Sequence, residues 1–196
     1  MIEADLDKPV GRTPRGRVGL VAALATAALM LGSQAAVAQT GGAGPPGGTT
    51  SPSAPPPSGS GQVFPVAGPH TFGDGFGAAR GSGRIHQGQD IMAACGTPLV
   101  SVSRARVKYV AFQRLAGNYV VLRYKKLHQD YVYAHLIAPA SVAKGQVVQA
   151  GQQIGNVGQT GDATACHLHF ELWLGKWYRG GHPVDPMPYL QTWPGY

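Results

Sequence analysis

The segment from His167 to Leu174 alternates between polar and apolar residues, and this alternation is the strongest structural constraint in the chain. Successive side chains of a β-strand point to opposite faces of the sheet, so His167, His169 and Glu171 would share one face. The apolar residues between them would line the other face and could join a core. Two imidazoles on one strand face lie about 7 Å apart. The pattern therefore predicts a strand with a core face and a face that carries a site.

Similar short segments recur through the second half of the chain. They are rich in Val, Tyr, Leu and Ile, turn-forming residues separate them, and no segment keeps a helical period. We expect strands at residues 99–102, 106–112, 119–124, 131–136, 146–148 and 167–174. The pattern predicts an all-β domain of curved antiparallel sheets. Its expected core residues are Ile85, Leu99, Val102, Val107, Val121, Val132, Ile154, Leu168 and Phe170.

The first 38 residues have the pattern of a secretory signal peptide. Basic residues, Arg12, Arg15 and Arg17, precede an apolar run from residue 18 to 31, and Ala36-Val37-Ala38 offers small residues for cleavage after residue 38. The segment also approaches the ~20 apolar residues of a spanning helix, so an uncleaved membrane anchor is the alternative. Either way we expect an exported protein that is secreted or faces the cell wall or periplasm.

Residues 39–62 consist largely of Gly, Pro, Ser, Thr and Ala. Such a stretch buries too little apolar surface to offset its conformational entropy, which predicts a disordered linker. The globular domain is then expected at residues 63–190, followed by a C-terminal tail at 191–196.

The chain of 196 residues is basic, with a formal net charge of +7. It stays basic after the predicted signal, with twelve Lys and Arg against six Asp and Glu from Gln39 onward. A basic exported protein is attracted to polyanions such as cell-wall polymers or anionic lipid surfaces. No aromatic or glycine signature of nucleic-acid binding accompanies the charge, so we expect no nucleic-acid partner. We expect a monomer.

His86 and Asp90 form an HxxxD pair. In a straight strand, residues four apart would be ~13 Å from each other, too far for both to reach one zinc ion at ~2 Å. The chain must therefore bend between them, and Gly88 permits a bend. A further histidine, His135, ends the segment 131–136, where strict alternation would place it on one face with Tyr131 and Tyr133.

His86, Asp90, His135, His167 and His169 are five groups suited to a metal centre. A catalytic zinc uses three protein ligands and leaves a position open for water, so three groups would bind and two would transfer protons. Spacing alone leaves open which imidazole of the HxH pair is the ligand. Glu171 is expected either to orient a ligand or to be a solvated charge. The other histidines, His70, His128 and His182, are expected at the surface.

Cys95 and Cys166 are the only cysteines of the chain. An even pair in an exported protein predicts a disulfide bond, here between the loop after Asp90 and the strand that begins at His167. Two free buried thiols are the alternative, and thiolate ligation of zinc is less expected because the site already has His and Asp.

The sequence resembles the lysostaphin-type, LytM-like zinc metallopeptidases. The matching segments, in the family's order and spacing, are Gly75-Phe76-Gly77, His86-Gln87-Gly88-Gln89-Asp90-Ile91, Gly96-Thr97-Pro98, Tyr133-Ala134-His135-Leu136, Gly145 to Gly158, Thr160-Gly161 and His167-Leu168-His169-Phe170-Glu171. The resemblance implies that His86, Asp90 and His169 bind zinc and that His135 and His167 are catalytic. It also implies cleavage of peptide bonds in peptidoglycan, in stem peptides or cross-bridges.

Parts of the sequence are also compatible with two other functions. A non-catalytic cell-wall module or an activator of another wall hydrolase would have the same fold, but the five site residues favour an enzyme. Residues 144–155 read as a strand-turn-strand hairpin like those of lipoyl or biotinyl domains, yet no lysine lies at the tip to carry such a group. We interpret the hairpin as shared architecture, a β fold of the barrel-sandwich hybrid type.

Overall fold

The computed structural model describes residues 61–195. The predicted signal peptide and nearly all of the predicted linker lie outside the described residues, and the domain boundaries remain predictions. Within residues 61–195, no helix has the length and apolarity that a membrane span requires.

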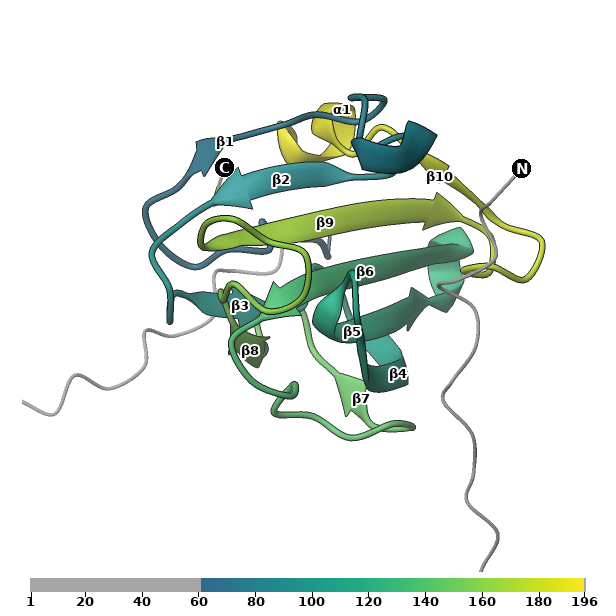
Figure 1. Ribbon diagram of the computed structural model, residues 1–196. Helices are drawn as coiled ribbons and strands as arrows, with labels where there is room; N and C mark the ends of the chain where they lie inside the picture. The colour runs from purple at the N-terminus through teal and green to yellow at the C-terminus, as the bar shows by residue number, and fades with distance from the viewer. Residues whose placement is uncertain (1–60, 196) are drawn as a thin grey trace, which may run out of the picture. The chain divides into compact units, whose positions relative to one another are not determined.

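One antiparallel sheet of eight strands forms most of the described structure (Figure 1). Its strands follow the order β1-β2-β9-β6-β5-β4-β7, and β10 also pairs with β9. They are β1 (Thr71–Phe72), β2 (Gln89–Met92), β4 (Ala105–Gln113), β5 (Gly117–Tyr124), β6 (Gln129–Leu136), β7 (Val147–Val148), β9 (His167–Leu174) and β10 (His182–Val184). The predicted antiparallel all-β fold is confirmed.

A second, two-stranded sheet pairs β3 (Pro98–Val100) with β8 (Gln153–Asn156). The helices are short: the 3-10 helices η1 (Gly81–Gly83) and η2 (Lys125–Leu127), and α1 (Met187–Leu190). Three of the strands, β1, β2 and β10, are not among the predicted ones; none exceeds four residues, too few to show a clear alternation. The predicted hairpin at residues 144–155 is wrong: its two strands, β7 and β8, do not pair with each other, because β7 pairs with β4 and β8 with β3.

The main apolar core lies against one face of the large sheet. It contains Leu168, Phe170 and Leu172 of β9, as the alternation predicts, together with Tyr131 and Tyr133 of β6. Trp193 contacts this core through edge-to-face packing on the ring of Phe170. The predicted C-terminal tail therefore contributes a residue, Trp193, to the main core.

A second apolar cluster covers part of the opposite face of the sheet. It contains Val121 and Val132, which are buried as expected but on the other side of the sheet from Phe170. Trp177, from the loop between β9 and β10, packs over them and over Tyr119. The same face carries the histidines of β9.

Ile85 is 66% exposed, so its assignment to the core is wrong. It follows η1 in a surface turn and forms only an isolated β-bridge with Ala79. Ile85 is not part of an alternating segment, so the sequence pattern held no information on whether its side chain is buried.

Candidate metal centre and active site

Strand β9 supplies the centre of the site. Its partner β2 is in a register that pairs Asp90 directly with His169. Directly opposed residues on neighbouring strands have adjacent side chains, and here Asp90 Oδ1 lies 3.0 Å from His169 Nδ1. The pairing brings together two groups that are 79 residues apart in the sequence.

His86 reaches the same point from outside the strands, because the chain bends at Gly88 as the spacing predicts. The bend brings His86 Nε2 to 3.0 Å from Asp90 Oδ1 and 2.8 Å from His169 Nδ1. Gly88 is required for a second reason: a Cβ atom there would lie 2.3 Å from the carbonyl oxygen of Phe170.

These three atoms form a nearly equilateral triangle that fits a zinc ion. Ligand atoms ~2.1 Å from a tetrahedral zinc are ~3.4 Å apart, close to the 2.8–3.0 Å edges found between His86, Asp90 and His169. Among the described residues they form a group of possible metal ligands whose ligating atoms lie within 4.8 Å of one another. Two imidazoles and one carboxylate are a ligand set typical of zinc.

The ligand rings are oriented by hydrogen bonds at their other nitrogen atoms. His86 Nδ1 is 2.8 Å from the carbonyl oxygen of Gly75, and His169 Nε2 is 3.0 Å from Glu171 Oε1. Glu171 in turn accepts a hydrogen bond from Trp173 Nε1 at 2.7 Å. Such partners fix the orientation and tautomer of a metal-binding histidine. Glu171 is therefore a buried partner of His169 and not a solvated charge.

A β-bulge places His135 beside the other site histidines. Between the pairs Val120↔Tyr133 and Asn118↔Leu136, Tyr119 on β5 faces both Ala134 and His135. His135 has a φ of 63°, in the left-handed region. Bulges next to active sites commonly redirect a side chain in this way.

The expectation that His135 shares a face with Tyr131 and Tyr133 is therefore wrong. The two tyrosines are in the core, whereas His135 lies on the site face, with its ring centroid 4.7 Å from that of His167. Each of these two rings has Nδ1 within 2.9 Å of a carbonyl oxygen, that of Thr160 for His135 and that of Ala165 for His167. Nε2 is then the atom of each ring that can exchange a proton with a substrate.

Burial and neighbouring charges separate the pKa values of the site groups. Burial alone would raise the pKa of Asp90, but hydrogen bonds from His169 and His86 outweigh it and hold this pKa well below its usual range. Burial would lower the pKa of His169, but the carboxylates of Asp90 and Glu171 raise it to about 9. Burial and the nearby charge of His169 lower the pKa of His135 to about 4, so His135 is neutral at neutral pH.

The profile of peptidase family M23 matches residues 84–186, which is more than half of the chain and includes all five site residues. The chain belongs to peptidase family M23. Membership makes it a metallopeptidase by homology, in agreement with the resemblance stated above.

Solved structures support this assignment to family M23. The catalytic domain of lysostaphin from Staphylococcus simulans superposes with a TM-score of 0.58 at 32% identity, over 63% of this chain and 93% of that one. A zinc-containing peptidase from Vibrio cholerae gives a TM-score of 0.57 at 32% identity, over 65% of this chain and 39% of that one.

The match to two curated relatives covers only part of each of them. The L-Ala--D-Glu endopeptidase of Bacillus subtilis is 34% identical over 143 residues, which is 67% of this chain and 43% of that protein. Lysostaphin of Staphylococcus staphylolyticus is 32% identical over 113 residues, 57% of this chain and 23% of that protein. The chain thus spans less than half the length of these two relatives.

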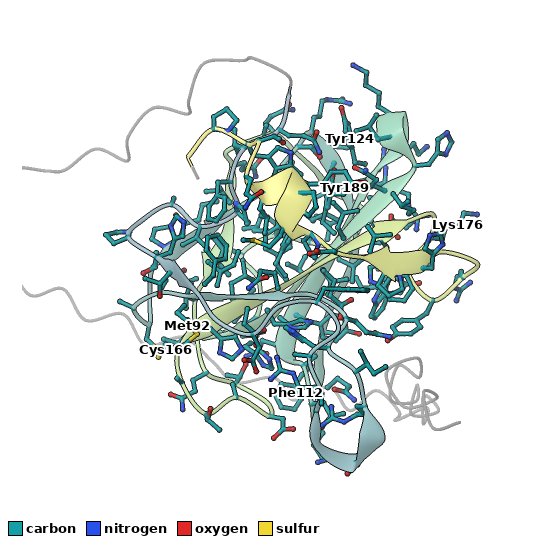
Figure 2. All side chains as sticks on the ribbon, turned by 90° about the horizontal axis from the view of Figure 1, so that it is seen from above. Met92, Phe112, Tyr124, Cys166, Lys176 and Tyr189 are labelled. Atoms are coloured by element: carbon teal, nitrogen blue, oxygen red, sulfur yellow. A yellow bond between two sulfur atoms is a disulfide. The ribbon has the colours of Figure 1, made fainter. Side chains whose placement is uncertain are left out.

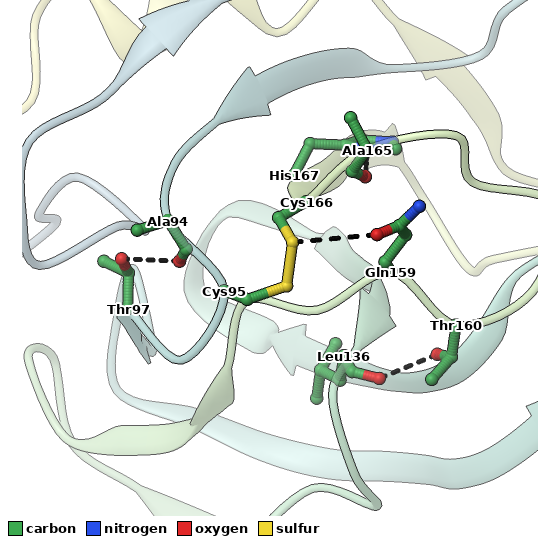
Figure 3. The surroundings of a disulfide bond; sticks show 9 residues. All are labelled: Ala94, Cys95, Thr97, Leu136, Gln159, Thr160, Ala165, Cys166 and His167. Atoms are coloured by element: carbon green, nitrogen blue, oxygen red, sulfur yellow. Dashed lines mark hydrogen bonds between the residues drawn. A yellow bond between two sulfur atoms is a disulfide. The ribbon is translucent and has the colours of Figure 1, made fainter.

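The disulfide expected from the sequence is present in this M23 domain, between Cys95 and Cys166, with their Cα atoms 5.2 Å apart (Figure 3). It joins the loop after β2 to the residue that precedes β9. Figure 2 shows Cys166 beside Met92, the last residue of β2, which pairs with His167. The bond therefore closes one end of the strand pair that carries the proposed ligands.

The remaining histidines lie away from this site. His128 and His182 are exposed as expected, whereas His70 is partly buried and stacks on Phe64 with ring centroids 4.4 Å apart. Sequence reasoning missed Arg80, whose guanidinium group lies 2.5 Å from Asp90 Oδ2. Nothing in the spacing or type of a loop arginine signals such a contact.

Proposed function

We propose that this protein is an exported zinc endopeptidase that hydrolyses peptide bonds in bacterial peptidoglycan, in stem peptides or cross-bridges. The observation that carries the proposal is the triangle formed by His86 Nε2, Asp90 Oδ1 and His169 Nδ1 beside a second pair of imidazoles, in a chain of family M23. Relatives named as peptidoglycan DD-endopeptidases and as an L-Ala--D-Glu endopeptidase support this substrate class.

In this proposal His86, Asp90 and His169 hold the zinc ion. The chemistry that zinc supplies at such a site is Lewis-acid activation of water and of the scissile carbonyl group. A single ionised carboxylate among the ligands leaves the centre with net positive charge, which suits a developing oxyanion.

His135 and His167 would carry out the proton transfers. The Nδ1 of His135 is taken up by the carbonyl oxygen of Thr160, so the free Nε2 of the neutral ring can accept a proton from the attacking water. The ring that has taken this proton is an imidazolium ion, and it can pass the proton from Nε2 to the leaving amine; the ring of His167, with its centroid 4.7 Å from that of His135, lies in the same site. Before it gives up the proton, the imidazolium ring can also donate a hydrogen bond from Nε2 to the oxyanion.

Export rests on the sequence pattern of residues 1–38, and the disulfide agrees with an oxidising compartment. The basic charge of the chain would favour anionic cell-wall polymers as a surface to which the enzyme is held. Amino-terminal sequencing of the protein recovered outside the cell would test cleavage after Ala38.

The direct test is mass spectrometry of the products released from purified peptidoglycan by residues 39–196, with and without a zinc chelator. New peptide amino termini that disappear with chelator, and that the D90A variant does not produce, would establish the activity and name the bond. If folded, zinc-loaded protein released no new termini, the role would instead be that of a wall-binding module or an activator.

A further inference from the structure

Arg80 makes an ion pair with the proposed metal ligand Asp90. The guanidinium nitrogen Nη2 of Arg80 lies 2.5 Å from Asp90 Oδ2, and Nη1 lies 3.3 Å from Asp74 Oδ2. The Asp90 side chain is 8% exposed and that of Arg80 31% exposed, so the ion pair is shielded on the side of the ligand. An arginine stays charged at all relevant pH values and presents several donors in one fixed plane.

Backbone hydrogen bonds fix the turn from which the side chain of Arg80 extends. Arg80 N donates to the carbonyl oxygen of Arg84 at 2.9 Å and so closes the turn that contains η1. Asp74, the second partner of Arg80, is also hydrogen-bonded to Asp90, because Asp90 N donates to the carbonyl oxygen of Asp74 at 2.9 Å. Arg80, Asp74 and Asp90 therefore form a closed network.

The two oxygen atoms of Asp90 are thereby given separate partners. Oδ1 faces His86 and His169 at 3.0 Å, whereas Oδ2 accepts from Arg80. A charged donor on one carboxylate oxygen restrains rotation of the group and draws charge from that oxygen, which favours metal binding through the other oxygen.

From this geometry we infer that Arg80 is a positioning residue that fixes Asp90 as a one-oxygen ligand through Oδ1. The inference rests on the proposed function, because it takes His86, Asp90 and His169 as the metal ligands. It assigns to Arg80 an effect on metal affinity and coordination that is separate from substrate binding.

The chain offers a matched control in the same turn. Arg84 pairs with Asp162 at 3.4 Å, but both side chains are exposed, at 41% and 62%, and neither is among the partners of Asp90. R80M and R84M each remove one guanidinium group from this turn. Only R80M removes the partner of Oδ2.

The experiment measures zinc affinity by competition with a chelator for wild type, R80M, R80K, R84M and D90A, each checked for folding by circular dichroism. We expect R80M to bind zinc about tenfold more weakly, as for other partners of metal ligands, and R84M to equal wild type. R80K should lie between them, because an ammonium group can hold Oδ2 but lacks the planar fork that also reaches Asp74.

Cobalt(II) replaces zinc for a spectroscopic readout. Visible absorption of Co²⁺ reports coordination number, so R80M should change the band intensity if Asp90 then offers both oxygens, and R84M should not. Unchanged affinity and spectrum in R80M would overturn the inference, and so would tighter binding, because the positive charge of Arg80 would then outweigh its positioning effect.

The D90A variant distinguishes a failure of the metal-ligand assignment from a failure of the inference about Arg80. If D90A bound zinc as tightly as wild type, the metal assignment would fail and the inference with it. If D90A lost zinc while R80M kept it, the inference about Arg80 alone would fail. Should R80M not fold, R80K and R80Q answer the same question.

Discussion

Gly88 passes so close to Phe170 of β9 that the carbonyl oxygen of Phe170 occupies the space where a side chain would begin. The hydrogen of Gly88 thus sets the separation between the segment that carries His86 and the strand that carries His169. Any larger residue must push the two apart, and the triangle of proposed ligands would widen with them.

We therefore predict that G88A lowers the free energy of unfolding by about 2–4 kcal/mol and weakens zinc binding. G81A is the control, because a Cβ atom at residue 81 meets nothing within 4 Å and that residue has no positive φ. It should change stability by less than about 0.5 kcal/mol. Denaturant unfolding of both variants checks this; equal stabilities would contradict the role given to the close approach.

Because His135 has a left-handed backbone conformation, two variants can separate the catalytic role of its ring from the effect of its backbone on stability. Asparagine adopts this conformation more readily than alanine, so H135N should keep the fold while activity on peptidoglycan falls by about 10²–10⁴-fold. H135A should lose activity similarly and be less stable than H135N by about 1 kcal/mol. Residual activity near wild type in H135N would exclude His135 from proton transfer.

Zinc affinity should depend on pH through His169. Its pKa of about 9 in the metal-free protein means that zinc must displace a proton below that pH. The logarithm of the affinity should then rise by about one per pH unit from pH 6.5 to 9 and level off above. The same proton stabilises the metal-free fold: this contribution is full below pH 6.5 and is lost as the pH rises through about 9. An affinity flat across this range would contradict the assignment.

The Cys95–Cys166 bond closes a long loop, with a sequence separation of 71. In the chain-entropy model its loss lowers the free energy of unfolding by about 4 kcal/mol. The double variant C95S/C166S should show this loss in denaturant unfolding. Wild type treated with reductant should match the double variant, and a difference of less than about 1 kcal/mol from untreated wild type would mean that the bond contributes little.

Sequence reasoning predicted the long strands and the five site residues because alternation over six or more residues and paired metal-binding residue types are local signals. It failed where a local signal was missing. His135 breaks the alternation at a bulge, which no residue type announces. Ile85 is apolar but lies in a surface turn. The contact of Arg80 with Asp90 depends on how a turn folds back on a strand, which pattern reasoning cannot resolve.

The strand order has a consequence for how the site moves. β9 pairs with β6 along one edge and with β2 and then β10 along the other, so its backbone amides should exchange with solvent among the slowest in the domain. His86 lies outside any strand, before β2 begins. The backbone of His86 is held only by turn hydrogen bonds with Gly77 and Ala78, so its amide should exchange faster than that of His169.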